Sequence, residues 1–183
     1  ELDEVLVTAT RTEVALRDSL SPAQVIGRAE IERSQATSLQ QLLSGRAGIN
    51  LTNMGGLGKQ TSLFLRGAGS NQLLVLVDGV RIGSATAGLP ALQDLPVELI
   101  ERIEIVRGPH SSLYGADAIG GVIQTFTRRE HGGLQPRAMV GAGSNRLREA
   151  SAGLGLGGER GWFGADLAFL RTDGINACNG TAA

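Results

Sequence analysis

The sequence predicts an α+β domain, a small mixed sheet with short helices, followed by antiparallel strands of the kind that form a transmembrane β-barrel. Within residues 1–130, short apolar runs are separated by turn residues and short amphipathic segments. After a polar linker at 128–133, segments of about ten residues alternate apolar and polar side chains, a barrel pattern. Glycine contributes 27 of 183 residues, against a usual share of about 7%, which indicates many turns and closely approaching backbones.

Composition excludes several classes of function. The net charge of −1 supplies no basic field for nucleic acid. One cysteine, Cys178, excludes an intramolecular disulfide and a zinc site with several cysteines. The longest uninterrupted apolar run, 73–77, is too short for a transmembrane helix. Residues 1–20 do not read as a signal peptide, which a mature exported chain would be expected to have lost.

The first elements are short. Val5-Leu6-Val7 reads either as an edge strand at a frayed end or as an extended peptide that adds to a partner's sheet. Residues 21–26 are expected to form a strand and 29–34 a helix. Thr37 and Gln40 form a capping box for a second helix, which buries Leu39, Leu42 and Leu43 and ends at Gly45.

Residues 53–61 resemble a phosphate-binding loop but fail the test for one. Asn53 stands where the first glycine belongs, and Gln60 stands where a hydroxyl must reach magnesium. Residues 63–65 read as a strand rather than the helix that such a loop needs.

The strongest hairpin signal lies at 73–81, where Asp78-Gly79 suits a type I′ turn. Residues 73–77 are apolar on both faces, which predicts a covered central strand. A loop of small residues follows at 82–91, and Pro96 begins a short helix that leads into a strand at 102–106.

That strand ends at Arg107-Gly108-Pro109, because proline cannot donate to a ladder. Ser111 and Ser112 are expected to cap a helical turn that Gly115 ends. Gly120-Gly121 lets the backbone pass close to another element before a strand at 122–127.

The last segments, 137–143, 147–156 and 162–172, place apolar residues on one face, such as Leu154, Leu156, Leu167 and Phe169. Trp162 and Phe163 beside a turn suit an interfacial aromatic girdle. A soluble antiparallel sheet is the alternative. Residues 153–158 match G-x-G-x-x-G, but no helix opens after them, so the dinucleotide interpretation fails.

Three stretches together resemble one family. RGPHSSLYGADAIGGVIQ at 107–124, LFLRG at 63–67 and LLVLVDGVR at 73–81 are similar to the plug domain of TonB-dependent outer-membrane receptors. Asp3 to Ala9 resembles the Ton box of that family. The resemblance implies a Ton box segment at 1–12, a plug domain at 13–130, and the first three strands of an incomplete barrel at 131–183. Since a barrel around a plug needs about 22 strands, the chain is expected to be a fragment.

Within that family the chain most resembles the outer-membrane cobalamin (vitamin B12) receptors. The resemblance implies uptake driven by the periplasmic protein TonB, an outer-membrane location, a monomer when complete, and no enzymatic activity or catalytic residue. No cofactor or metal is expected in this chain, although calcium is possible in the complete receptor. Gln124, where the family usually has Asn, and the loop at 54–60 depart from the pattern.

The resemblance also assigns residues to roles. TonB binding is assigned to Asp3, Glu4, Val5, Leu6, Val7, Thr8 and Ala9. Substrate binding is assigned to Met54, Gly55, Lys59, Gln60, Thr86, Ala87 and Gly88, in two loops that face the substrate. Arg66 and Arg107 are expected to pair with carboxylates on the barrel wall.

Two alternatives remain open. A ferric-siderophore or haem receptor would share the plug motifs and differ in the substrate loops. A soluble nucleotide-binding enzyme would rest on the two glycine motifs.

Overall fold

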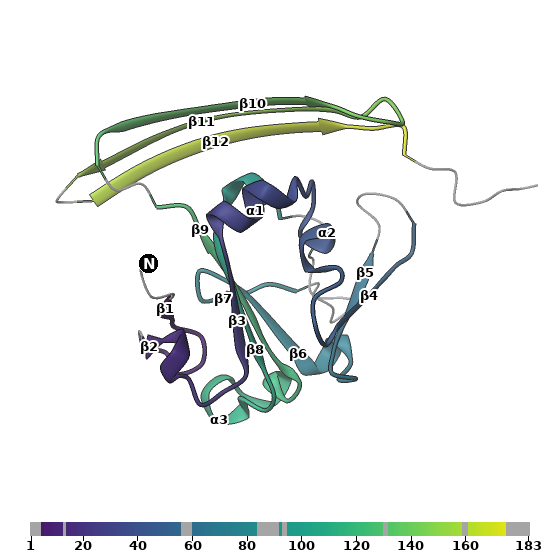
Figure 1. The fold of residues 1–183 in the computed structure, drawn as a ribbon, viewed down its shortest axis with the longest axis vertical. Coiled ribbons are helices and arrows are strands. Elements are labelled where there is room, and N and C mark those ends of the chain that lie inside the picture. Colours follow the sequence, from purple (N-terminus) through teal and green to yellow (C-terminus); the bar gives the residue numbers. More distant parts are fainter. Residues whose placement is uncertain are drawn as a thin grey trace, which may run out of the picture. The chain divides into compact units, whose positions relative to one another are not determined.

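The computed structural model describes residues 5–12, 14–55, 60–83, 92, 95–129, 132–158 and 161–174. The chain forms two compact units, one of residues 1–52 with 60–127 and one of residues 53–59 with 128–183. Each unit has its own sheet (Figure 1).

The first unit is built on a five-stranded sheet of order β3-β8-β9-β6-β7. Its strands are β3 (Ala23–Gly27), β8 (Ile100–Arg107), β9 (Gly121–Thr127), β6 (Leu73–Val77) and β7 (Val80–Arg81). The β6–β9 pair is parallel and the other pairs are antiparallel, so the sheet is mixed, as expected. β6 lies between β9 and β7 with 73–76 buried, which confirms the covered strand.

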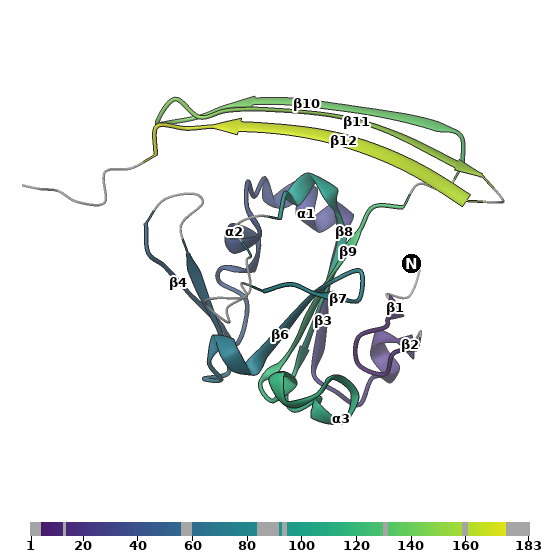
Figure 2. The same ribbon diagram turned by 180° about the vertical axis from the view of Figure 1, so that it is seen from behind.

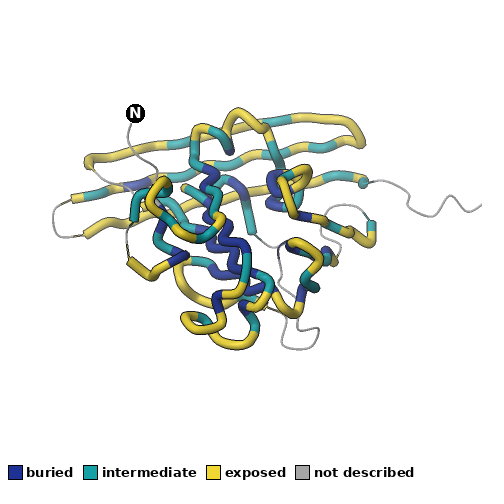
Figure 3. The backbone as a smooth tube through the Cα atoms, turned by 60° about the horizontal axis from the view of Figure 1, so that its bottom comes forward, coloured by how far each residue is buried: buried dark blue, intermediate teal, exposed yellow. Residues whose placement is uncertain are grey.

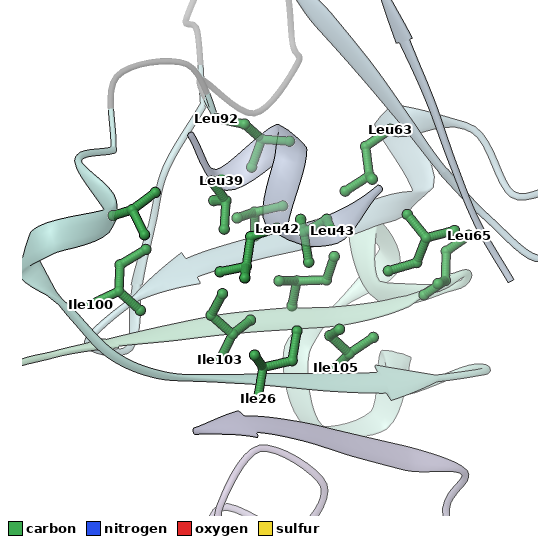
Figure 4. Close-up of a cluster of buried hydrophobic side chains, with 14 of the residues drawn as sticks. Ile26, Leu39, Leu42, Leu43, Leu63, Leu65, Leu92, Ile100, Ile103 and Ile105 are labelled. Atoms are coloured by element: carbon green, nitrogen blue, oxygen red, sulfur yellow. The ribbon is translucent and has the colours of Figure 1, made fainter. Parts of the chain in front are cut away.

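One face of this sheet carries the main core. Two short helices, α1 (Arg28–Ser34) and α2 (Leu39–Leu43), and the hairpin of β4 (Ile49–Asn53) with β5 (Thr61–Leu65) supply side chains to it. Figure 4 shows the leucines of α2 and β5 above isoleucines of the sheet, among them Ile26, Ile103 and Ile105. Each fully buried aliphatic side chain contributes about 1.5–3 kcal/mol, so the small sheet draws its stability mainly from this face.

The opposite face is covered by different segments. The strand β1 (Val5–Leu6) pairs antiparallel with β2 (Val14–Ala15). Leu6 of β1 and Ala9, which follows it, are buried in one cluster with Val25 and Val106. Further along, α3 (Ser111–Tyr114) and a 3-10 turn at Ala116–Ala118 cover the β9–β6 side. Figures 1 and 2 show β1 and β2 on one side of β3 and α2 on the other.

Short 3-10 turns, at Leu16–Asp18, Ser70–Gln72 and Val97–Leu99, lead into the strands. The turn at Val97–Leu99 follows Pro96, and the strand then begins at Ile100, two residues before the predicted start. None of the helices in the described ranges combines the length and the apolar character that crossing a bilayer requires.

Two predicted caps are wrong. Ser38, not Thr37, caps α2, and its hydroxyl accepts a hydrogen bond from the Gln41 amide. The Gln41 side chain accepts hydrogen bonds from Thr37, so the box is shifted by one residue. His110, rather than Ser111 or Ser112, stands at the cap of α3, without a side-chain cap bond.

Turn predictions based on glycine are confirmed. Asp78 and Gly79 have φ of 47° and 83°, the left-handed pair that a type I′ hairpin requires. Gly115 ends α3 with φ of 88°. At Gly121 a Cβ atom would stand 2.4 Å from the Val106 carbonyl oxygen and 2.5 Å from Leu65 Cδ2, so only glycine fits there.

The second unit is an antiparallel sheet of β10 (Leu134–Ala142), β11 (Arg148–Gly158) and β12 (Gly161–Arg171). Its register places apolar residues in rows, such as Leu134, Leu156 and Phe163, and then Val140, Ala150 and Phe169. The predicted alternation is therefore confirmed. The large side chains of this face are exposed, for example Val140 at 86% and Leu167 at 79%. Figure 3 shows these strands mostly in the exposed and intermediate colours.

The other face of this sheet is mostly polar or small, with Met139, Trp162 and Leu170 as its large apolar side chains. Arg137 and Asp166 form an ion pair of 2.9 Å between β10 and β12, and Gly153 lies between them on β11. A Cβ at Gly153 would stand too close to the Asp166 carboxylate, so glycine makes room for this pair. Trp162, opposite Gly157, lies on this face, whereas its neighbour Phe163 lies on the apolar one. The rejection of a dinucleotide site at 153–158 is confirmed, because these residues belong to β11 and β12 follows, not a helix.

Candidate functional site

The N-terminal segment, defined here as residues Val5–Ala9, is docked against the first unit. Its first two residues form β1, in which Leu6 pairs with Val14. Leu6 and Thr8 are fully buried, and Ala9 is nearly so. The described residues of the segment expected to bind TonB are therefore held by the first unit itself. Asp3 and Glu4 lie outside the described residues, as does the side chain of Val5.

The segment is held by one carboxylate. Glu104 Oε2 accepts hydrogen bonds from the Val7 amide at 2.8 Å, the Thr8 amide at 2.7 Å and the Thr8 hydroxyl at 2.6 Å. The Glu104 side chain has no exposed surface. Hydrogen bonds to a charged acceptor contribute about 1.5–3 kcal/mol each, more than neutral ones, so this is the strongest polar contact of the segment.

The sheet places Glu104 where the segment lies. In the register, Glu104 on β8 is opposite Val25 on β3 and Gln124 on β9. These three side chains share the face of the sheet that Leu6 packs against, whereas Ile103 and Ile105 point into the main core. The Thr8 hydroxyl also lies 3.3 Å from the Gln124 side-chain oxygen, a weaker contact than its bond to Glu104.

Other groups hold the same segment from α3. The Tyr114 hydroxyl donates a hydrogen bond of 2.9 Å to the Thr8 carbonyl oxygen. The chain then turns, with the Arg11 amide donating to the Val7 carbonyl at 2.8 Å. The Arg11 guanidinium lies 4.5 Å above the Tyr114 ring. Burial raises the pKa of the Tyr114 phenol above its usual value, which keeps it protonated as a donor.

The two arginines expected to contact the barrel lie beside each other. A Cβ placed on Gly48 would be 3.2 Å from Arg66 Cγ and 3.8 Å from Arg107 Nε. Arg107 is nearly buried and donates to two neutral acceptors, the Ala47 carbonyl at 3.2 Å and the Gln24 side-chain oxygen at 2.7 Å. Burial, and then the charge of Arg66, lower the pKa of Arg107. This pair of like charges would gain from an added carboxylate.

The residues expected to bind substrate are only partly described. Met54 is 76% exposed, and Gln60 is exposed as well. The Gly55 amide donates to the Asn53 side chain at 2.7 Å. Lys59, Thr86, Ala87 and Gly88 lie outside the described residues. The substrate surface therefore stays a prediction.

Sequence reasoning assigned no role to Glu104 or Tyr114. The sequence shows only that Glu104 lies between Ile103 and Ile105 in an alternating strand, and the structure adds that residues 103–107 of this strand are all buried. A carboxylate at such a position requires partners, since burying an unpaired charge is costly. What the sequence could not show is that those partners come from residues 7 and 8.

The chain is similar to known proteins in sequence and in fold. The family model described as TonB-dependent Receptor Plug Domain matches residues 15–122. The Vitamin B12 transporter BtuB of Vibrio vulnificus is 44% identical over 149 residues, which cover 81% of this chain and 24% of that protein. The Vitamin B12 transporter BtuB of Vibrio cholerae is 38% identical over 175 residues, or 95% of this chain and 29% of that protein.

A solved structure shows the same fold. The pyoverdine outer membrane receptor FpvA of Pseudomonas aeruginosa, bound to pyoverdine, superposes with a TM-score of 0.75 at 19% identity. The match covers 92% of this chain and 24% of that one. This chain thus spans about a quarter of the length of the proteins that it matches.

Proposed function

Since this chain belongs to the family of TonB-dependent receptor plug domains, we propose that it is the plug portion of an outer-membrane transporter that binds cobalamin and imports it with energy transduced by TonB. The observation that carries this proposal is the identity of 44% and 38%, over 81% and 95% of this chain, to two proteins described as vitamin B12 transporters. The role is gated transport, not catalysis.

The N-terminal segment is the contact for TonB in this proposal. TonB pairs with residues 3–9 as an added strand on the periplasmic side, where backbone hydrogen bonds supply affinity. The docked position of Val5–Ala9 supports a gate, because the Val7 and Thr8 amides are already bonded to Glu104. Substrate binding at the outer face has to free the segment before TonB can pair with it.

The substrate surface consists of Met54, Gly55, Lys59, Gln60, Thr86, Ala87 and Gly88, together with loops of the barrel. The high exposure of Met54 supports this role, because a large apolar side chain left in water can contribute to a binding surface. No metal is assigned to this chain. Calcium in the complete receptor would be held on a loop beyond Asp173.

Arg66 and Arg107 anchor the plug to carboxylates of the barrel wall in this proposal. Their closeness over Gly48 and the neutral acceptors of Arg107 support it. The strands β10, β11 and β12 begin that barrel, with the exposed apolar face toward lipid.

A ferric-siderophore receptor is the second candidate, and the pyoverdine receptor named above has the same fold. A likeness of 19% identity supports the fold alone. Neither glycine motif supports the nucleotide-binding enzyme, because the strand β5 follows residues 53–60 and the second motif lies inside the strand β11.

The deciding experiment is titration calorimetry of cyanocobalamin against the complete receptor in detergent, with a ferric siderophore in parallel. We expect tight binding of cyanocobalamin and none of the siderophore. Binding of the siderophore alone would keep the plug and its gate and reject cobalamin as the substrate.

The same titration tests the loop through Met54→Ala. We expect an affinity loss of roughly tenfold, the usual scale for truncating one buried contact at an interface. Leu20→Ala is the matched control, because Leu20 is likewise a large apolar residue left exposed, at 103%. Equal affinities for the two variants would remove Met54 from the substrate surface.

A further inference from the structure

We propose that Glu104 is the docking group for the N-terminal segment, and that the bonds it makes to Val7 and Thr8 set how much of the segment is free for TonB. The second half of this inference rests on the proposed function, since TonB is the partner that takes the free segment. The first half concerns this chain alone.

The bonds to Glu104 and pairing with a partner strand are mutually exclusive. The Val7 and Thr8 amides are consecutive, and both donate to one oxygen, Glu104 Oε2. In an extended strand, consecutive amides point to opposite sides, so both cannot reach one acceptor. A partner strand can therefore add to this stretch only after the bonds to Glu104 break and the backbone extends.

The sheet positions the carboxylate for this task. Glu104 Oε1 accepts from Arg102 Nε at 3.0 Å, which leaves Oε2 for the segment. The Arg102 guanidinium in turn lies 3.9 Å above the Phe126 ring. Arg102 thus fixes the carboxylate orientation and balances its charge while the segment covers it.

The energetics suit a reversible contact. In the docked state Glu104 has lost its water but has gained three donors from the segment and one from Arg102. When the segment leaves, water can hydrate the carboxylate again and replace those donors. The net cost of release is therefore much smaller than the cost of burying an unpaired charge. When the free-energy difference between the docked and the free segment is small, substrate binding can shift the equilibrium between them.

Removal of the Glu104 carboxylate is expected to release the N-terminal segment. In Glu104→Ala, the Val7 and Thr8 amides would be buried without an acceptor in the docked position, which favours the free segment. Arg102 would lose its partner but is partly exposed, so solvent can satisfy it.

The test is hydrogen exchange of the complete receptor in detergent, read by mass spectrometry on peptides that contain residues 5–9. We expect exchange in Glu104→Ala to be faster by roughly tenfold or more, because hydrogen bonds to a charged acceptor are lost. Glu101→Ala is the matched control, since it makes the same change at an exposed residue of the same strand. Unchanged exchange at residues 5–9 in Glu104→Ala, with β8 and β9 still protected, would overturn the proposal.

A second variant guards against loss of the sheet. Thr8→Val removes the hydroxyl that donates to Glu104 at 2.6 Å, together with its weaker contact of 3.3 Å to Gln124, and replaces no residue of β8 or β9. We expect faster exchange of residues 5–9 in this variant also, with the sheet amides as slow as in the unmodified receptor. Equal protection of the segment in Thr8→Val and the unmodified protein would contradict a docking role for this contact.

Binding of the purified periplasmic domain of TonB, without substrate, separates the two halves of the inference. We expect tighter binding to Glu104→Ala, because apparent affinity rises with the fraction of free segment. Equal binding despite faster exchange would overturn the link to TonB and leave the docking role. Absence of TonB binding to every variant would instead reject the proposed function, while the exchange result still decides the role of Glu104.

Discussion

Gly121 shows how one residue permits the contact between three strands. It begins β9, and a Cβ there would collide with the Val106 carbonyl of β8 and the Leu65 side chain of β5. The pair Gly120-Gly121 was predicted from the sequence to let two backbones approach, because adjacent glycines before a strand have few other uses. Only the structure shows which segments come close to Gly121, since Leu65 and Val106 come from distant parts of the chain.

We predict that Gly121→Ala destabilises the plug by about 1–3 kcal/mol or more, the usual cost of overpacking a filled core. Its φ of 147° adds strain for any residue with a side chain. The measurement is hydrogen exchange of β8 and β9 at increasing urea concentration.

Gly133→Ala is the control for that measurement, because a Cβ at Gly133 would meet no atom within 4 Å. If the amides of β8 and β9 lost their protection at the same urea concentration in both alanine variants, the close approach at Gly121 would have no energetic importance.

Glu104 is the residue for which local reasoning was least informative. Its neighbours Ile103 and Ile105 mark a buried strand, and the alternation of β8 puts Glu104 on the opposite face. Whether that face met solvent, lipid or protein could not be derived from the strand itself, because its cover comes from residues almost a hundred positions earlier.

At the scale of elements, β1 has two possible partner strands, which are β2 of this chain and, in our proposal, a strand of TonB. In the structure it pairs with β2, and Leu6 packs in one buried cluster with Val25 and Val106. The sequence indicated an extended segment here, since three β-favouring residues follow one another. The pairing with β2 was missed, because a two-residue strand carries almost no sequence signal.

We predict that Leu6→Pro abolishes TonB-dependent uptake and leaves substrate affinity unchanged, because proline removes a backbone donor that an added strand needs. Uptake of radiolabelled substrate by cells and equilibrium binding to purified receptor measure the two properties.

The control is Leu6→Ala, which keeps the backbone N–H and removes only the buried side chain. We expect it to loosen docking yet to retain uptake. Normal uptake by Leu6→Pro would show that TonB does not pair with this stretch.

The other elements were predicted correctly where a few adjacent residues indicate the structure, and were misplaced or missed elsewhere. The hairpin at Asp78-Gly79 was predicted from two residues, because few other sequences favour a left-handed pair. The cap of α2 was misplaced by one position, because Thr37 and Ser38 are both good caps and only their contacts with Gln41 distinguish them. β4 was missed, since Ile49 is the only buried residue among its five and the strand carries no clear apolar alternation.

At the scale of the whole molecule, the two units bury their apolar residues differently. The first has apolar residues of its sheet in contact with helices or with the N-terminal segment. The second leaves large apolar side chains exposed along one face, including Leu154, Leu156, Phe163 and Leu167. Such a face needs a cover, and lipid is the cover that our proposal supplies.

We predict that Leu167→Arg lowers the stability of the complete receptor in lipid by about 2–4 kcal/mol, the cost of a cationic side chain facing the membrane interior. Urea unfolding of the receptor in vesicles measures this change.

Leu170→Arg provides a matched comparison, because Leu170 lies on the other face, opposite Glu149, where an arginine can find a partner. Equal stability of the two variants would contradict a lipid-facing role for the apolar rows.

The sequence by itself determined the elements whose signals are local: the covered strand β6, its type I′ turn, the glycine approach before β9, and the alternating faces of β11 and β12. Periodicity and turn chemistry act over a few residues, so they can be read without a fold. Only the tertiary structure decided that the N-terminal segment is docked and that Glu104 holds it. That contact joins residues 97 positions apart, and it depends on the register that aligns Val25, Glu104 and Gln124 in one row. Register over such distances is a property of the assembled sheet, because it follows from which strands pair and not from any one of them.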